Sequence, residues 1–154
     1  MKALILSGYG INCEEETFNA FNIAGIEATI VHINDLIENP KKLKSFQVLA
    51  LPGGFSYGDH TGSGNAMAHK IKNNLFENIV DFIERDKLVI GICNGCQILI
   101  NWGIAPASEG YKRELALVEN DIPTYQCRWV NIKVIRQKSP WLKKIKELYL
   151  PVAH

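Results

Sequence analysis

The sequence predicts an α/β fold with a mainly parallel sheet, and three observations support this prediction. Through the first two thirds of the chain, short apolar runs typical of buried strands alternate with segments of helical spacing. Glycine-rich stretches follow directly where predicted strands end, as loops that serve a binding site often do. Beyond Pro106 the pattern changes to alternating polarity, which predicts added antiparallel strands.

The individual elements follow from these patterns. Apolar runs predict buried strands over residues 3–7, 28–33, 48–51 and 88–92. Helical spacing predicts helices over residues 14–24 and 66–85, and another after residue 92 that ends at Gly103. Alternation predicts half-exposed strands at residues 130–134 and 148–153. The segment 39–44 is polar and expected to be exposed, whereas Met67 lies in an apolar stripe and is expected in the core.

Length and composition narrow the class of protein. At 154 residues, the chain is expected to form one domain with its own core. Its 17 basic and 16 acidic side chains, without a basic stripe, predict no nucleic-acid partner. No apolar run approaches the roughly 18 to 20 residues of a membrane helix, and the first strand is too short for a secretion signal. We therefore expect a cytoplasmic protein that does not bind membranes and whose four cysteines are reduced.

The stretch GICNGCQ, residues 91–97, allows two interpretations. Cys93 and Cys96 could form a redox pair, in which the second thiol resolves the first at the start of a helix. Alternatively, Cys93 alone could be a nucleophile and Cys96 a packing residue. A metal site is not predicted, because zinc usually needs two such pairs and the remaining cysteines and histidines follow no ligand spacing.

The nucleophile interpretation explains more of the residues. Gly91 to Gly95 follow the pattern Gly-x-nucleophile-x-Gly of a strand-turn-helix elbow, with cysteine in place of serine. Side chains at the two glycines would collide with neighbouring backbone in so tight a turn. Cys93 would then lie at the carboxyl edge of the sheet, where amides that open the next helix stabilise its thiolate.

A nucleophile that attacks a carbonyl also needs an oxyanion hole and a base. The backbone N–H of Asn94, directly after the nucleophile, can supply one donor to the oxyanion. Gly53 or Gly54, at the end of the preceding strand, can supply the other. His154, which ends the sequence PVAH after a predicted strand, is the candidate base, although a lone C-terminal histidine is often only a surface residue.

These residues resemble those of class I glutamine amidotransferases. GICNGCQ is similar to their Gly-x-Cys-x-Gly-x-Gln signature, in which the position of Cys96 is open. PGGFSYGD, residues 52–59, resembles the glutaminase subunits of phosphoribosylformylglycinamidine synthases, a family of purine biosynthesis. NCEEET, QCRWV and PVAH follow in that family's order, so the resemblance spans the chain.

The resemblance implies a fold, an activity and a partner. The fold would be a flavodoxin-like open sheet with helices on both faces and added antiparallel strands. Cys93 would attack the side-chain amide of L-glutamine, the amides of Gly54 and Asn94 would hold the oxyanion, and His154 would transfer protons. Gln97 matches the family's substrate-binding glutamine. Ammonia would pass to an ATP-dependent synthetase subunit, on which ATP and Mg are expected, because this chain has no phosphate-binding loop.

The sequence departs from the family at two places. After Asp59 the family commonly has an aromatic and a basic residue, whereas this chain continues HTGSGN. The family's triad also includes an acid two residues after the histidine, and this chain ends at His154. We therefore expect a domain truncated at its C-terminus, and two alternatives stay open: a catalytically impaired remnant that only binds the synthetase, or a Cys-x-x-Cys redox protein.

Overall fold

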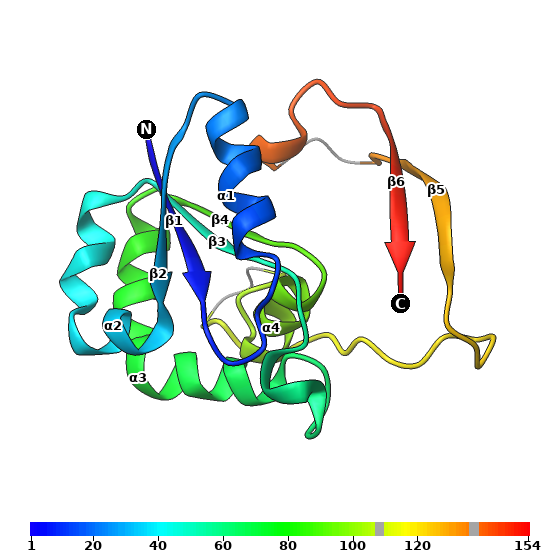
Figure 1. The fold of residues 1–154 in the computed structure, drawn as a ribbon, viewed down its shortest axis with the longest axis horizontal. Coiled ribbons are helices and arrows are strands. Elements are labelled where there is room, and N and C mark those ends of the chain that lie inside the picture. The colour runs from blue at the N-terminus through cyan, green and yellow to red at the C-terminus, as the bar shows by residue number, and fades with distance from the viewer. Residues whose placement is uncertain (107–109, 136–138) are drawn as a thin grey trace. The chain divides into compact units, whose positions relative to one another are not determined.

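The computed structural model of the protein describes residues 1–106, 110–135 and 139–154. It contains two compact units, Met1–Leu117 and Val118–His154, each with a sheet of its own. Figure 1 colours the chain from the first unit in blue and green to the second in orange and red. The sequence predicted one domain over the same residues, and that assignment stays a prediction.

The first unit is built on a parallel sheet of four strands in the order β2-β1-β3-β4. These strands are β1 (Lys2–Ser7), β2 (Glu27–His32), β3 (Val48–Leu51) and β4 (Leu88–Gly91). The mainly parallel α/β fold predicted from the sequence is therefore confirmed, with strand ends that differ from the predicted ones by at most one residue. All four strands point the same way, so the segments that follow them meet at one edge.

Helices connect the strands of this sheet. They are α1 (Glu14–Ile23), α2 (Ile33–Glu38), α3 (Asn65–Glu84) and α4 (Asn94–Trp102), with short 3₁₀ segments η1 (Pro40–Ser45) and η2 (Ser56–Asp59). α1, α3 and α4 were predicted, but α2 was not, and Ile33 was wrongly assigned to the preceding strand. α2 is six residues long, too short to show a helical period, and begins where the His32 side chain accepts a hydrogen bond from the N–H of Asn34 at 3.2 Å.

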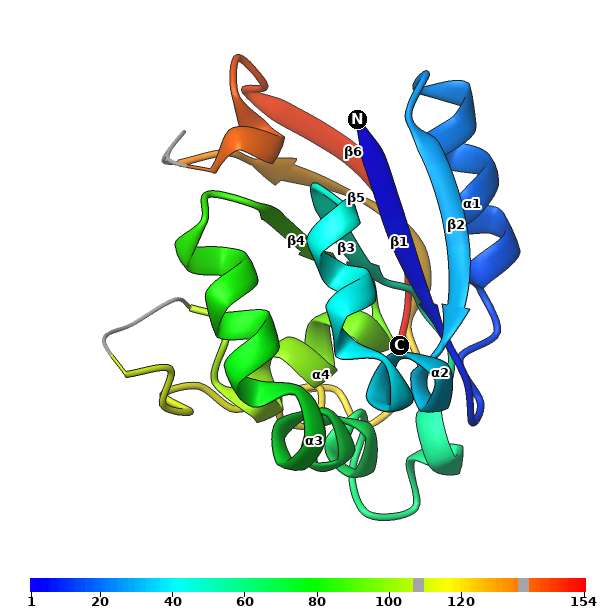
Figure 2. The same cartoon turned by 90° about the vertical axis from the view of Figure 1, so that its left-hand side faces the viewer.

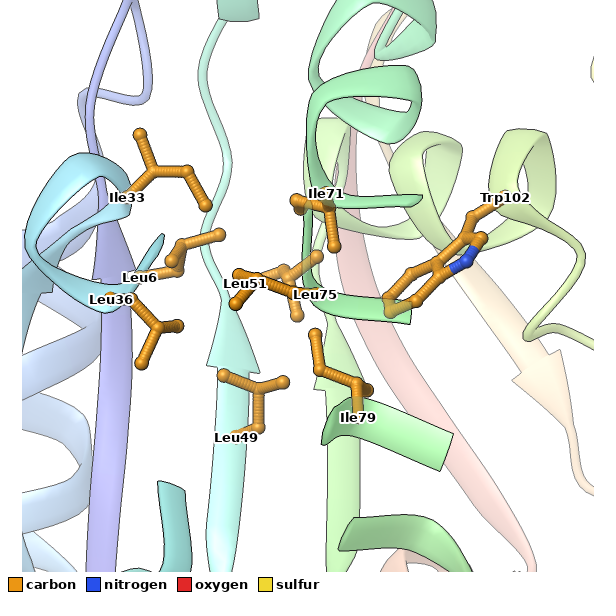
Figure 3. A pocket seen from close by; sticks show the side chains of 9 residues that line it. All are labelled: Leu6, Ile33, Leu36, Leu49, Leu51, Ile71, Leu75, Ile79 and Trp102. Atoms are coloured by element: carbon orange, nitrogen blue, oxygen red, sulfur yellow. The ribbon is translucent and has the colours of Figure 1, made fainter. Parts of the chain in front are cut away.

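Both faces of the sheet are covered by helices, as the family resemblance implied. Figure 2 shows α1 on one side of the sheet and α2 and α3 on the other. On the α3 side, alternate strand residues such as Leu6 and Leu49 meet the stripe of α3 that the sequence predicted, including Met67. Figure 3 shows nine side chains from β1, β3, α2, α3 and α4 that converge on this side of the sheet, and the space between them leaves no room for a water molecule.

Replacement of Leu75 by alanine is expected to destabilise the fold strongly. Leu75 is 0% exposed and lies at the centre of this cluster (Figure 3), so the shorter side chain would leave an apolar cavity. We expect the free energy of unfolding to fall by about 2–5 kcal/mol, measured by urea denaturation. Ile23→Ala is the matched control, because Ile23 is 89% exposed and its loss should change stability by less than about 0.5 kcal/mol. Equal losses in the two variants would contradict the central place of Leu75 in the core.

The second unit is a two-stranded antiparallel sheet of β5 (Cys127–Lys133) and β6 (Glu147–Ala153), with a 3₁₀ turn η3 (Pro140–Leu142) between them. Both strands and their direction were predicted from the alternating polarity. Within the described ranges they pair with each other as a two-stranded sheet, so the antiparallel strands added to the mainly parallel fold are confirmed. Trp129 and Tyr149 stack across the pair with ring centroids 5.0 Å apart.

Candidate active site

The loops that follow β1 and β3 separate at the carboxyl edge of the parallel sheet. β1 and β3 are neighbours, but the chain leaves β1 for β2 on one side and β3 for β4 on the other. Such a switch in strand order opens a crevice that commonly binds ligands. Here the two loops are joined by several backbone hydrogen bonds. The N–H groups of Asn12 and Cys13 donate to the carbonyl of Gly53 at 3.3 and 3.2 Å, and the N–H groups of Phe55 and Tyr57 donate to the carbonyls of Gly10 and Tyr9 at 2.8 and 2.6 Å.

Cys93 lies at this edge, in the turn between β4 and α4. It is the N-cap residue of α4 and has φ 52° and ψ −111°, a strained conformation for a residue with a side chain. Its side chain is exposed and its thiol is free. The strand-turn-helix elbow expected from the glycine spacing is thus present, with the sulfur accessible to a reactant.

The two glycines of the elbow are required by close backbone contacts. A Cβ on Gly91 would lie 2.6 Å from the carbonyl carbon and oxygen of Gly95. A Cβ on Gly95 would lie 1.9 Å from the carbonyl oxygen of Leu51, at the end of β3. No side chain fits at either position, so the sharp turn that presents Cys93 depends on both glycines.

The glycines after β3 lie against the nucleophile. A Cβ on Gly53 would be 3.5 Å from the Cβ of Cys93, so this loop is in direct contact with the elbow. Gly54 has φ 144°, and a Cβ there would be 2.5 Å from the carbonyl oxygen of Gly10. Within the described part of the chain, the N–H groups of Gly54 and Asn94 have no hydrogen-bond acceptor. These are the two donors predicted for the oxyanion.

A buried hydrogen-bond network joins the elbow to the glycine-rich loop. Asn94 is 0% exposed, and its Oδ1 accepts the N–H of Ser56 at 3.1 Å. Its Nδ2 donates to Oδ1 of Asp59 at 3.1 Å and to Oε1 of Gln97 at 2.9 Å. Gln97, the predicted substrate-binding residue, is half-buried in the first turn of α4. Asn94 and Gln97 were both predicted from the sequence, but Asp59 was missed as their partner.

Two other cysteines lie near Cys93. Cys96 is half-buried in α4, and burial, followed by the nearby Cys93, raises the pKa of its thiol. Cys13 and Cys93 both lie beside Gly53. A Cβ on Gly53 would be 3.4 Å from the Sγ of Cys13 and 3.5 Å from the Cβ of Cys93. Burial raises the pKa of the Cys13 thiol, and Glu16 and Cys93 raise it further. Neither thiol is activated as a nucleophile, and the sequence spacing did not indicate that Cys13 lies near Cys93.

His154 ends the second unit. Its N–H donates to the carbonyl of Gln126 at 2.9 Å, and its carbonyl accepts the N–H of Gln126 at 2.7 Å. Nδ2 of Asn120 donates to the same carbonyl at 3.2 Å. The backbone of His154 is therefore fixed by the β5–β6 ladder, although its side chain is exposed. The pairing of its imidazole with Cys93, which belongs to the other unit, stays a prediction.

The described residues contain neither a metal-binding cluster nor a membrane-spanning helix. No group of three or more His, Cys, Asp or Glu side chains among them is arranged to hold a metal ion. Within the same ranges, no helix combines the length and the apolarity that crossing a bilayer requires.

Comparison with known proteins identifies related sequences along the whole chain. The family model described as "CobB/CobQ-like glutamine amidotransferase domain" matches residues 1–154. The phosphoribosylformylglycinamidine synthase subunit PurQ of Methanococcus maripaludis (strain S2) is 50% identical over 155 residues, which cover 99% of this chain and 57% of the relative. The subunit of the same name from Dehalococcoides mccartyi is 43% identical over 155 residues, which cover 100% of this chain and 61% of the relative.

A solved structure shares the fold. The structure of PurLQS from Thermotoga maritima includes a chain that superposes with a TM-score of 0.77 and 32% sequence identity. The match covers 99% of this chain and 66% of that chain. The chain therefore spans less than two thirds of the length of each of these three proteins.

Proposed function

The chain belongs to the CobB/CobQ-like glutamine amidotransferase domain family, and from this premise we propose that it hydrolyses L-glutamine to glutamate and ammonia. The observation that carries the proposal is the exposed, free thiol of Cys93 in a strained elbow whose glycines admit no side chain. Strain of this kind persists where the surrounding structure fixes it, and it is common at catalytic nucleophiles. The position of Gly53 against Cys93 adds a second loop to the site.

The proposed reaction is a two-step acyl transfer. The Cys93 thiolate attacks the side-chain amide carbon of glutamine, and the oxyanion that forms accepts hydrogen bonds from the N–H groups of Gly54 and Asn94. The intermediate collapses to a thioester as His154 gives a proton to the departing ammonia. His154 then takes a proton from water, which attacks the thioester and releases glutamate. Gln97 holds the substrate beside the elbow.

The proposed use of the ammonia follows from the relatives. Two of them are named as subunits of phosphoribosylformylglycinamidine synthase, and the matching solved structure is named PurLQS. We propose that this chain likewise supplies ammonia to a synthetase subunit that makes phosphoribosylformylglycinamidine in purine biosynthesis. ATP and Mg would bind to that partner, and this chain would need no cofactor. Cytoplasmic location stays a prediction from the sequence.

A glutamine analogue that carries an electrophilic carbon in place of the side-chain amide tests the proposed function. We expect it to modify Cys93 and to leave Cys13 and Cys96 unmodified at neutral pH, because the raised pKa values of these two thiols keep them protonated. Mass spectrometry of the digested protein identifies the modified residue, and excess L-glutamine should protect Cys93.

The pattern of modification also decides between the alternatives. Equal modification of Cys93 and Cys96, or no modification of the folded chain, would contradict the proposed function. A reversible Cys93–Cys96 disulfide of defined potential, measured in a thiol buffer, would favour the redox alternative instead. Binding of the synthetase without any reaction at Cys93 would favour the impaired remnant.

A further inference from the structure

We infer that Asp59 is a positioning residue, whose carboxylate acts together with the N–H of Ser56 to fix which end of the Gln97 side-chain amide faces the substrate. This inference rests on the proposed function. It gives a role to the glycine-rich loop, which continues after Asp59 in a way unlike the family that the chain resembles. The carboxylate acts through Asn94 and does not itself touch the substrate.

The carboxylate of Asp59 is fixed from two sides. Its Oδ1 accepts the N–H of Gly64 at 3.1 Å as well as Nδ2 of Asn94 at 3.1 Å. Gly64 in turn lies directly against α4, because a Cβ there would be 2.8 Å from the backbone nitrogen of Ile98. The loop is thus attached to the first turns of α4 both by hydrogen bonds and by close packing.

The backbone of this loop is held in an unfavourable conformation. Tyr57, Gly58 and Asp59 have φ values of 56°, 66° and 54°, three successive residues in the left-handed region. Residues that carry a side chain rarely adopt this backbone conformation unless other contacts compensate for the strain. The bonds that Asp59 makes with Asn94 and Gly64 are such contacts, so the strained loop and the elbow stabilise each other.

The hydrogen-bond donors and acceptors determine the orientation of the Asn94 amide. The N–H of Ser56 is a donor, so the Asn94 atom that faces it must be the oxygen. The Asp59 carboxylate only accepts, so the Asn94 nitrogen must face Asp59. One hydrogen of that nitrogen is used by Asp59, and the other is directed at Gln97.

The orientation of Gln97 follows from that of Asn94. Because Nδ2 of Asn94 donates to Oε1 of Gln97, the Gln97 amide presents its nitrogen on the opposite side. This Nε2 group has no acceptor among the described residues, and Gln97 is only half-buried. It can therefore donate to an oxygen of a bound ligand, and L-glutamine offers such oxygens in its α-carboxylate and its side-chain carbonyl. Without Asp59, Nδ2 of Asn94 loses one of its two acceptors, so only the N–H of Ser56 still fixes the Asn94 amide and Gln97 is held less firmly in this orientation.

The test compares two reagents that modify Cys93. The glutamine analogue needs Gln97 to bind, whereas iodoacetamide needs only an accessible thiol. The quantity compared is the ratio of the second-order rate constant for the analogue to that for iodoacetamide. In Asp59→Gly this ratio should fall about tenfold. Asp59→Asn should keep this ratio within about threefold of the wild-type value, because its side-chain oxygen can still accept from both Gly64 and Asn94.

Two further variants separate the loss of the acceptor from loop flexibility and from a change in surface charge. Asp59→Ala should lower the ratio as Asp59→Gly does, and a loss confined to the glycine variant would assign the effect to loop flexibility and overturn the inference. Asp81→Asn removes one carboxylate from the surface of α3, where Asp81 pairs with Arg85, and should leave the ratio unchanged. All variants are measured below their thermal midpoints. If Asp59→Gly and Asp59→Ala both unfold, Asp59→Asn still tests the inference, because a lowered ratio in that variant would contradict it.

The outcomes separate this inference from the proposed function. A wild-type ratio in Asp59→Gly, or a loss in Asp59→Asn as large as in Asp59→Gly, would overturn the role of Asp59 and leave the proposed function intact. If the wild-type chain shows no preference for the glutamine analogue and no protection by L-glutamine, the proposed function fails, and the role of Asp59 fails with it.

Discussion

Gly95→Ala is expected to destabilise the chain by about 3 kcal/mol or more, which is a large part of the stability of an ordinary domain. The added Cβ would lie 1.9 Å from the carbonyl oxygen of Leu51 and 2.6 Å from its carbonyl carbon. These atoms belong to the backbone and cannot rotate away. The same carbonyl accepts the N–H of Ile92 at 3.0 Å, so moving it would also break the link between β3 and the elbow.

Urea denaturation measures this effect, with Gly25→Ala as the matched control. Gly25 has φ +75°, but a Cβ there would meet no atom within 4 Å. Alanine at Gly25 should therefore cost only about 1 kcal/mol, the usual penalty of a left-handed conformation. We expect Gly95→Ala to lower the unfolding midpoint much more than Gly25→Ala, and to abolish any reaction that depends on the elbow. Similar midpoints for the two variants would contradict the close contact between the elbow and β3.

The parallel sheet and its long helices could be predicted from the sequence because their residues repeat with a clear period. The stripe on α3 and the short apolar run of β3 are examples, and both are buried in the structure. α2 could not be predicted, because its six residues give less than two helical turns. The pairing of β5 with β6 in a separate sheet was also beyond the sequence, since alternating polarity indicates a half-exposed strand but not its neighbour.

The candidate site could be predicted in part for a similar reason. The nucleophile elbow has a local signature, because the contacts that exclude a Cβ at Gly91 and Gly95 require glycine at fixed spacing. Asp59 and Cys13 lie in PGGFSYGD and NCEEET, two stretches that carry the family resemblance, but no local pattern indicates that they contact the elbow. Asp59 comes close to Asn94 only because a loop of left-handed residues brings it there, and Cys13 reaches the site only because β1 and β3 are neighbours. Contacts of this kind depend on the fold and leave no local pattern.

Cys93→Ser is expected to lower the release of glutamate from L-glutamine at least about a thousandfold, the scale of effect seen when a catalytic nucleophile is removed. The substitution replaces sulfur by oxygen in an exposed side chain of nearly the same shape, so the fold should be kept. A hydroxyl at neutral pH is almost never ionised, and the first step of the proposed reaction requires an anionic nucleophile. The loss should therefore appear in kcat, while the unfolding midpoint stays within the error of the wild-type value.

Cys96→Ser is the matched control for this prediction, because it makes the same atomic change three residues further along, inside α4. The Cys96 thiol is half-buried, with a pKa raised by burial, and has no step in the proposed reaction. Its replacement should leave kcat within about threefold of the wild-type value. A redox pair predicts a different pattern, since the wild-type chain would then release no glutamate and either substitution would abolish the Cys93–Cys96 disulfide. Full activity of Cys93→Ser would exclude Cys93 as the nucleophile, whatever the behaviour of Cys96→Ser.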